Sequence, residues 1–248
     1  MNDESNSAFS IQRLVPDSDR IAGNVRDIVE RISRAAIRAG RRPDTICLVA
    51  VTKSVPVERI RPAVEAGVRI CGENRLQEAL PKIGALGGRD LRWHFIGRLQ
   101  RRKVKAVVGT FELIHSVDSM ELAAEIDRRA KEAGLQQGVL LEINVGREAT
   151  KTGFSPDEAA NVVAALDAMP NLAVRGLMAI PPPAQSADAA RPYFQAMREL
   201  ARSLASPHLH RVRMEELSMG MSRDFEVAVE EGATMVRIGT AIFGERHD

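Results

Sequence analysis

A lysine follows the first strongly apolar segment of this chain. Residues Leu48–Val51 predict a buried strand, and Lys53 comes two positions later, just before a turn and a helix. Lysine is almost never fully buried without a partner, and strand ends are where α/β proteins place their chemistry. A lysine whose pKa is lowered by burial can condense with an aldehyde. Lys53 is therefore the first candidate for covalent chemistry; the alternative is a side chain that reaches water.

A phosphate site is predicted near the end of the chain. The segments SMGMS (218–222) and RIGT (237–240) each close a predicted strand. Barrel proteins frequently bind phosphate there, through loop N–H groups and a helix N-terminus. The two segments supply two glycines for close backbone approach, three hydroxyl groups and one cation: Gly220, Gly239, Ser218, Ser222, Thr240 and Arg237. We favour this interpretation over a pair of ordinary turns.

The sequence predicts one further detail of the phosphate site and leaves two others open. Ser222 is expected to begin the helix that follows. Asp224 and Glu226 would then lie in the first turn of that helix and repel an anion unless they point away. Arg237 either adds its charge to the site or faces outward as an ordinary surface residue.

A lysine and a phosphate site at one barrel mouth would together hold an aldehyde that carries a phosphate. Pyridoxal 5′-phosphate (PLP) is such a molecule, and a sugar-phosphate aldolase with the same lysine chemistry is the alternative. His94, Ser116 and Met178 also lie at predicted strand ends and could line the pocket. A single histidine such as His94 is more often a packed core residue than a functional one.

The elements that position these residues alternate regularly. Eight short apolar runs predict strands: Thr45–Val51, Val68–Cys71, Leu91–Ile96, Phe111–Ser116, Val139–Val145, Leu172–Ile180, Val212–Leu217 and Thr234–Ile238. Helix-period segments separate them, which predicts a parallel sheet, and eight strands in about 250 residues is the usual size of a (β/α)8 barrel. An open, doubly wound sheet is the alternative. The seventh strand is the weakest, because Glu215 and Glu216 interrupt its apolar run.

The two ends of the chain predict an additional helix and a tail. The segment after the eighth strand is too short for a full final helix. An amphipathic N-terminal helix from Asp19 to Gly40 is expected to cover that flank of the barrel instead. Residues 1–18 are expected to form a disordered tail, and residues 19–248 a single barrel domain.

The composition argues against several classes of function. The chain has 248 residues, of which 44% are hydrophobic and 27% charged, and its net charge of +2 gives no strong field for nucleic acid. No stretch approaches the roughly 20 apolar residues of a membrane span, and the polar N-terminus lacks the features of a secretory signal. Cys47 and Cys71 lie in apolar runs and predict reduced core thiols. We therefore expect a cytoplasmic protein, and we predict no metal site.

Several long motifs resemble one protein family. They are LVAVTKSVP, CGENRLQEALPK, WHFIGRLQ, LLEINVGREATKTGF, VRGLMAIP and ELSMGMSRDFEVAVEEGATMVRIGTAIFGER. Together they are similar to the pyridoxal phosphate homeostasis proteins, the YggS/PROSC family. The resemblance implies a single-domain barrel, similar to the N-terminal barrel of alanine racemase, that binds PLP as a Schiff base on Lys53. It implies phosphate contacts from Ser218, Gly220, Ser222, Gly239 and Thr240, with Arg237 near the pyridine ring or the phosphate and Asn74 beside the cofactor.

Two positions depart from the family pattern. Arg102 stands where the family usually has asparagine, and Cys71 stands where an aromatic residue is common. The first could alter the rim near the loop after the third strand. Neither position touches Lys53 or the predicted phosphate site, so both leave the PLP expectation intact.

The resemblance implies a PLP carrier, which buffers PLP and supplies it to apoenzymes. The alternative is a PLP-dependent amino-acid racemase or decarboxylase that uses Lys53. Racemisation needs acid–base groups on opposite faces of the substrate, and the single tyrosine, Tyr193, lies in a predicted outer helix. If Arg237 faces the ring nitrogen, its charge disfavours the protonated ring and weakens the cofactor as an electron sink. Both observations favour a carrier, for which we expect a monomer.

A dense basic cluster raises a third hypothesis, nucleic-acid binding. The cluster consists of Arg98, Arg101, Arg102, Lys103 and Lys105. Such a run is usually a solvated surface, and no stacking aromatic residue accompanies it. We therefore do not expect nucleic-acid binding; an acidic protein partner or a phosphate is the other ligand that the cluster could take.

Overall fold

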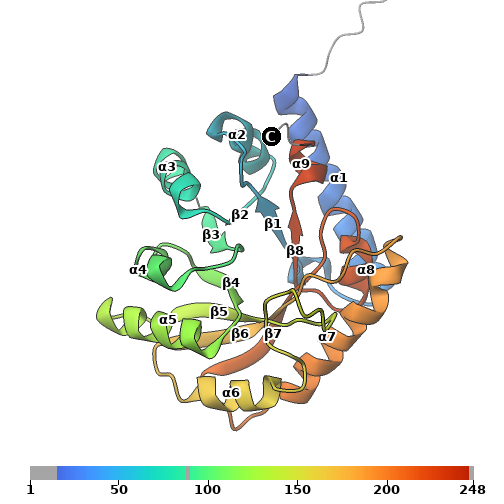
Figure 1. Cartoon of the computed structure of the whole chain (residues 1–248). Coiled ribbons are helices and arrows are strands. Elements are labelled where there is room, and N and C mark those ends of the chain that lie inside the picture. Colours follow the sequence, from blue (N-terminus) through green and yellow to red (C-terminus); the bar gives the residue numbers. More distant parts are fainter. Residues whose placement is uncertain (1–15, 88–89, 246–248) are drawn as a thin grey trace, which may run out of the picture.

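The predicted alternation of strands and helices closes into a barrel. The computed structural model describes residues 16–87 and 90–245. Its eight parallel strands pair in chain order, and the first also pairs with the last (Figure 1). The strands are β1 (Cys47–Val51), β2 (Ile70–Glu73), β3 (Arg92–Phe95), β4 (Leu113–Val117), β5 (Gln137–Glu142), β6 (Leu172–Met178), β7 (Val212–Ser218) and β8 (Met235–Ile238). The prediction of a (β/α)8 barrel is confirmed, and the open sheet is not formed.

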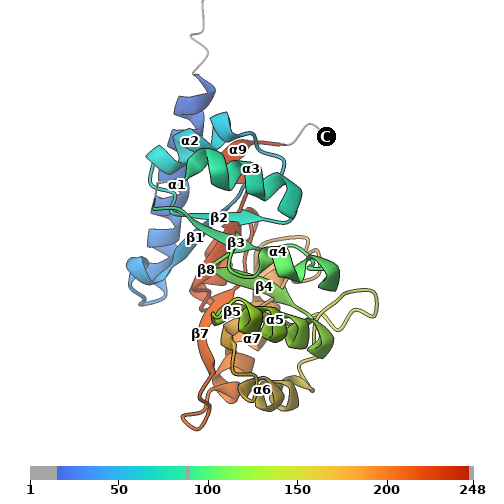
Figure 2. The same cartoon turned by 90° about the vertical axis from the view of Figure 1, so that its left-hand side faces the viewer.

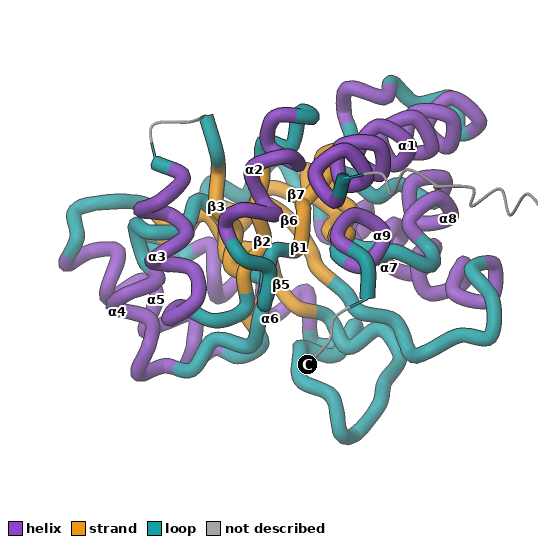
Figure 3. Tube along the Cα trace, turned by 90° about the horizontal axis from the view of Figure 1, so that it is seen from above, coloured by secondary structure: helices purple, strands orange, loops and turns teal. Residues whose placement is uncertain are grey.

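Helices surround the strands, as the view from above shows (Figure 3). They are α1 (Asp17–Arg38), α2 (Val57–Glu65), α3 (Leu76–Leu86), α4 (Val104–Val107), α5 (Met120–Glu132), α6 (Ala159–Asp167), α7 (Arg191–Leu204), α8 (Phe225–Glu230) and α9 (Thr240–Phe243). In the side view, α2 and α3 cover one part of the barrel, and α5 and α6 cover another (Figure 2). Their apolar faces pack on the outside of the strands and bury the larger core.

Helix α1 takes the place of a full-length final helix. Helix α9 has only four residues, and α1 packs against α2, α8 and α9, burying Ile21, Val25 and Ile28. The side-chain amide of Asn24 donates to the carbonyl oxygen of Ile242 at 2.9 Å, which ties α1 to α9. The predicted role of the N-terminal helix is thereby confirmed.

The start of α1 differs slightly from the prediction. The helix begins at Asp17, so the last two residues of the tail predicted for residues 1–18 are helical. Asp17 and Asp19 lie in its first turn, where negative charge is favourable. Residues 1–15 of the predicted tail lie outside the described residues.

The seventh strand forms despite its two glutamates. Strand β7 pairs with β6 through Glu216 and Leu217, and Ser218 pairs with Met235 of β8. The hydroxyl of Thr234 donates to the carboxylate of Glu216, which gives this charged side chain a polar partner within the barrel wall. This hydrogen bond allows a charged residue within the strand. The pattern of apolar residues in the sequence does not reveal such a bond.

The barrel interior has its own small apolar cluster. Alternate strand residues face inward, and six of them form a cluster separate from the outer core: Val49, Ile70, Leu113, Leu140, Met178 and Met235. Beyond it toward the carboxyl ends of the strands, the inward-facing residues become polar, beginning with His115 on β4 and Ser218 on β7. The change from apolar to polar side chains marks the carboxyl end of the barrel as the place to look for a functional site.

Candidate functional site

Lys53 and Asn74 lie at the same end of two neighbouring strands. In the register of β1 and β2, Val51 is paired with Gly72, and the N–H of Thr52 donates to the carbonyl of Gly72 at 3.0 Å. Lys53 comes two residues after Val51, and Asn74 comes two residues after Gly72. Both side chains are half-buried. The side-chain oxygen of Asn74 is buried and has no hydrogen-bond partner among the described residues. Such an atom suits a ligand, because buried polar atoms are normally paired.

A buried ion pair holds the strand end before Lys53. The ammonium of Lys82, on α3, donates to the carbonyl of Thr52 at 2.7 Å and to the carboxylate of Glu73 at 2.8 Å. The hydroxyl of Thr52 donates to the same carboxylate oxygen at 2.7 Å. Burial raises the pKa of Glu73, and the hydrogen bonds from Lys82 and Thr52 oppose that rise. We call Thr52, Glu73 and Lys82 the β1 clamp.

A second contact fixes the backbone after Lys53. The N–H of Ser54 donates to the carboxylate of Glu78 at 2.8 Å, and this bond is the main cause that lowers the pKa of Glu78. Ser54 has a φ of 57°, a left-handed conformation that is uncommon for serine. Lys53 is therefore flanked on both sides by residues whose backbone is held by helix α3.

The two segments of the predicted phosphate site lie side by side. The N–H of Arg237 donates to the carbonyl of Gly220 at 3.0 Å, and the N–H of Ala241 donates to the hydroxyl of Ser222 at 3.4 Å. Gly220 has a φ of 89°, and a Cβ atom there would lie 2.5 Å from that of Ala228. Only glycine fits this position without strain. Gly239, which is buried, and Thr240, which is exposed, begin the neighbouring loop and helix α9.

One expectation about this loop is wrong. Ser222 does not begin the next helix, because α8 starts at Phe225 with Asp224 in the capping position. The carboxylate of Asp224 turns back on its own loop and accepts from the N–H of Met221 at 2.6 Å. Ser222 instead reaches toward the start of α9, and Asp224 is occupied within its loop.

Arg237 points into the barrel and not outward. Its guanidinium donates to the carbonyl and the hydroxyl of Ser218, each at 2.6 Å, and to the carbonyl of Ala179 at 2.9 Å. It makes no ion pair within residues 16–87 and 90–245. Burial lowers the pKa of Arg237 to about 10, with Asp224 and Glu142 acting in the opposite direction. A buried cation without a paired anion favours binding of an electron-rich ligand.

Two histidines extend this polar network across the barrel. Nδ1 of His115 lies 2.9 Å from the hydroxyl of Ser218, and its Nε2 lies 3.0 Å from Nδ1 of His94. Burial lowers the pKa of His94 to about 3, helped by Arg92 and Arg175. Burial also lowers the pKa of His115 well below its ordinary value. Both rings are therefore neutral at physiological pH.

The three predicted pocket residues have different surroundings. His94 lies inside the barrel within this network, and Met178 belongs to the apolar interior cluster. Ser116 is buried, and its hydroxyl donates to the carbonyl of Gly97 at 2.5 Å, away from the network that includes its neighbour His115. The structure therefore brings His94, but not Ser116, into contact with the residues around Arg237.

The histidine pair predicts a pH dependence of stability. In the unfolded chain a histidine takes up a proton near pH 6.5, whereas His94 and His115 stay neutral in the folded protein well below that value. The unfolded state then binds more protons, so the free energy of unfolding should fall with decreasing pH, by about 1.4 kcal/mol per unit for each histidine. Denaturant unfolding between pH 5 and 8 measures this slope.

A comparison of variants isolates the histidine contribution. His94→Asn should remove about half of the slope, whereas Phe95→Leu, a non-titrating core change on the same strand, should lower stability and leave the slope unchanged. The comparison is needed because burial raises the pKa of Glu73 and Glu142. These two carboxyl groups make the free energy of unfolding rise as the pH falls, which opposes the effect of the histidines. An unchanged slope in His94→Asn would contradict the neutral pair.

Lys82 was not among the predicted site residues, although its position in the sequence carries a partial signal. Ala79, Lys82 and Leu86 are the buried residues of α3, so Lys82 interrupts an apolar helix face. A lysine in such a position predicts a buried partner. The partner, Glu73, lies within a short apolar strand, but a sequence pattern does not pair the two.

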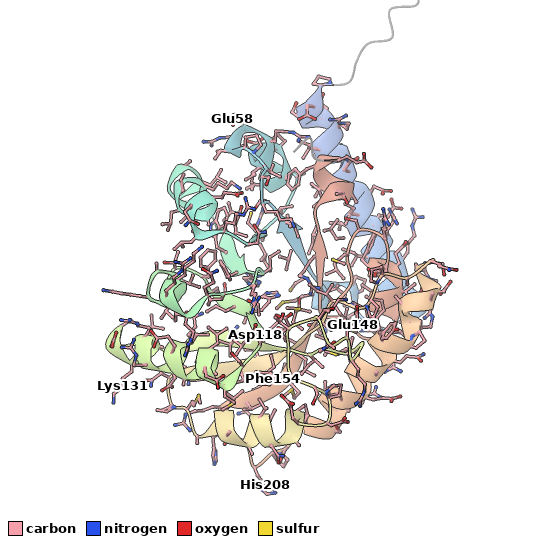
Figure 4. All side chains as sticks on the ribbon, viewed as in Figure 1. Glu58, Asp118, Lys131, Glu148, Phe154 and His208 are labelled. Atoms are coloured by element: carbon pink, nitrogen blue, oxygen red, sulfur yellow. The ribbon has the colours of Figure 1, made fainter. Side chains whose placement is uncertain are left out.

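The surface of the barrel is distinct from its centre. Asp118, which directly follows β4, appears near the middle of the molecule, whereas Lys131 on α5 and His208 lie at the outer edge (Figure 4).

Among the described residues, no helix combines the length and the apolar character that crossing a membrane requires.

The fold and the site define a class of protein. The family model "Alanine racemase, N-terminal domain" matches residues 17–247. The alanine racemase of Clostridium difficile superposes with a TM-score of 0.70 at 17% identity, over 91% of this chain and 58% of that one. At this identity the likeness concerns the fold alone. The chain is a barrel of the alanine racemase N-terminal class.

Closer relatives identify the family within this class. The pyridoxal phosphate homeostasis protein of Aquifex aeolicus is 48% identical over 88% of this chain and 95% of its own length. That of Pseudomonas aeruginosa is 43% identical over 91% and 96%. PipY of Synechococcus elongatus, solved with PLP bound, is 38% identical with a TM-score of 0.76, covering 88% of this chain and 100% of that chain. The chain belongs to the pyridoxal phosphate homeostasis protein family.

Proposed function

We propose that this protein binds PLP at the carboxyl ends of its strands and takes part in PLP homeostasis. The observation that carries the proposal is that Lys53 follows the carboxyl end of β1 by two residues, while Arg237, paired with Val49, lies one residue before the carboxyl end of the adjacent strand β8. Lys53 would hold the cofactor as a Schiff base, in which the amine and the aldehyde form a C=N bond and release water. When bound, PLP supplies a reactive aldehyde and an electron-withdrawing ring.

The surrounding residues fit the remaining parts of PLP. The loops at Ser218–Ser222 and Gly239–Thr240 would bind the phosphate, because Gly220 leaves room for close approach and Ser222 and Thr240 supply hydroxyl groups. Asn74 would bind through its unpaired side-chain oxygen. Arg237 would face the ring or the phosphate with N–H groups that Ser218 and Ala179 leave unused.

The same geometry supports a carrier more than an amino-acid enzyme. Tyr193 lies on α7, outside the barrel, and cannot serve as an acid–base group at the mouth. An arginine at the ring nitrogen keeps that nitrogen unprotonated and weakens electron withdrawal. We propose a cytoplasmic, monomeric carrier that supplies PLP-dependent apoenzymes.

The transfer experiment tests the carrier directly. PLP-loaded protein is mixed with the apo form of a PLP-dependent enzyme in the presence of a phosphatase that destroys free PLP. We expect the loaded protein and its Lys131→Ala variant to restore enzyme activity, because bound PLP is shielded. Free PLP at equal concentration, and PLP mixed with Lys53→Ala, should restore little. Equal restoration by free PLP and loaded protein would contradict a carrier function.

One observation keeps a PLP-dependent racemase or decarboxylase as the second candidate. Glu142, at the end of β5, is a carboxyl whose pKa burial raises, with the charge of Arg237 opposing that rise. A carboxyl of raised pKa near the mouth could exchange protons with a substrate. We expect no catalytic α-proton exchange when amino acids are incubated with loaded protein in deuterated water. Rapid exchange that requires both Lys53 and Glu142 would establish the enzyme instead.

A further inference from the structure

We infer that His94 and His115 are positioning residues for Arg237 and act on it through Ser218. Four side chains from β3, β4, β7 and β8 form one continuous chain of contacts: His94 to His115, His115 to Ser218, and Ser218 to Arg237. We call these four residues the relay. The inference rests on the proposed function, because it concerns how the proposed PLP site is held.

The relay is buried along its whole length. His115 and Ser218 have no exposed surface, His94 is 1% exposed and Arg237 is 5% exposed. The three contacts measure 3.0, 2.9 and 2.6 Å, all within hydrogen-bond range. A polar chain in the interior of a barrel is stabilising only when its donors and acceptors match. Its protonation pattern is therefore restricted.

Arg237 sets the direction of every hydrogen bond in the relay. A guanidinium only donates, so the hydroxyl of Ser218 accepts from it and has its own proton available for Nδ1 of His115. His115 then carries its proton on Nε2 and donates to Nδ1 of His94. His94 in turn carries its proton on Nε2, a buried atom that has no hydrogen-bond partner among the described residues. In the opposite arrangement that nitrogen would still be unpaired, and the hydroxyl proton of Ser218, beside a guanidinium that only donates, would also be buried without an acceptor.

The charges around the relay favour neutral imidazole rings. After burial, the positive charges of Arg92 and Arg175 help to lower the pKa of His94, and those of His94 and Arg237 help to lower the pKa of His115. A protonated His115 would donate from both nitrogens and could no longer accept from Ser218. A neutral His115 is therefore the condition for Nδ1 to accept the hydroxyl proton of Ser218 while the same hydroxyl accepts from Arg237.

The consequence for the site is a fixed guanidinium. One terminal nitrogen of Arg237 contacts the carbonyl and the hydroxyl oxygen of Ser218, and the other contacts the carbonyl of Ala179. If His115 no longer orients the hydroxyl, the guanidinium loses a directed acceptor and gains rotational freedom. The N–H groups proposed to face PLP would then no longer be preorganised.

Nitrogen-15 NMR of the unmodified protein without PLP tests the relay first. His94 and His115 should both show the tautomer protonated on Nε2 and should not titrate between pH 5 and 8, while the exposed His208 and His210 provide reference signals. A proton on Nδ1 of His115, or titration of either buried ring in this range, would overturn the inference without reference to PLP.

Two substitutions at one position then test the effect on the site. His115→Asn keeps an acceptor near the position of Nδ1, whereas His115→Phe removes it. We expect PLP affinity to fall about tenfold in His115→Phe, with a shifted absorption maximum of bound PLP, and to be largely restored in His115→Asn. A folded His115→Phe with unchanged affinity and spectrum, or an Asn variant as weak as the Phe variant, would refute the relay.

The outcomes separate the relay from the proposed function. If the unmodified protein does not bind PLP, the proposed function fails, and the NMR result still reports on the relay. If His115→Phe does not fold, the pair His94→Asn and His94→Phe repeats the comparison one contact further from Arg237. Equal affinity and equal spectra in that second pair would then count against the relay.

Discussion

Replacing Lys53 with alanine should abolish the covalent attachment of PLP while leaving the barrel folded. The side chain is half-buried at the end of β1, so its loss should change the free energy of unfolding by no more than about 1 kcal/mol. Without the amine no C=N bond can form, and only the contacts of Asn74, Arg237 and the phosphate loops would remain. The absorption band of bound PLP should therefore disappear, and PLP should separate from the protein on gel filtration.

Lys131→Ala is the matched control for this experiment. Lys131 is an exposed lysine on α5, at the outer edge of the molecule (Figure 4), and its loss should leave the absorption band and the retained PLP unchanged. If Lys53→Ala keeps both the band and the PLP, another amine holds the cofactor and the proposed role of Lys53 is wrong.

Replacing Lys82 with methionine should produce the largest loss of stability. The substitution leaves the fully buried carboxylate of Glu73 without its cation. Breaking a buried pair in this way typically costs about 3–5 kcal/mol. For a chain of this length the melting temperature should fall by roughly 10 °C. Because the carbonyl of Thr52 also loses a donor, the strand end before Lys53 should become less ordered, and PLP binding should weaken in parallel.

A double variant and a change of pH test this explanation. Glu73→Gln added to Lys82→Met removes the unpaired charge and should recover much of the lost stability. In Lys82→Met the pKa of Glu73 should rise further, because the hydrogen bond and charge of Lys82 no longer oppose the effect of burial. A raised folded-state pKa of a carboxyl favours folding at low pH. The loss of unfolding free energy in Lys82→Met, relative to the unmodified protein, should therefore be smaller at pH 5 than at pH 8. Lys131→Met controls for the loss of a lysine. A deficit that is equal at both pH values would contradict this role of the β1 clamp.

Local sequence patterns were sufficient for the barrel. Apolar runs located all eight strands to within a few residues, since each is short, buried and separated by helix-period segments. Even β7, with Glu215 and Glu216 in its run, was located. The short final segment also predicted correctly that α1 would cover the last flank. These features depend on local composition and on chain length, which a sequence displays directly.

The side-chain networks could not be predicted in the same way. His94, His115 and Ser218 come from three strands, and their contact depends on which strand residues face inward and on the barrel register. The pairing of Lys82 with Glu73 likewise depends on how α3 lies over β2. The orientation of Arg237 was open in the sequence because an arginine near a strand end can face either way. Only the closed barrel, in which Ser218 and Ala179 offer acceptors, selects the inward position.

The most direct measurement locates the bond between PLP and the chain. The unmodified protein is loaded with PLP, reduced with borohydride to fix any C=N bond, digested and analysed by mass spectrometry. We predict that the added mass lies on the peptide containing Lys53 and that fragmentation assigns it to that residue. An adduct confined to other lysines, or no adduct on protein that retains PLP, would contradict the account.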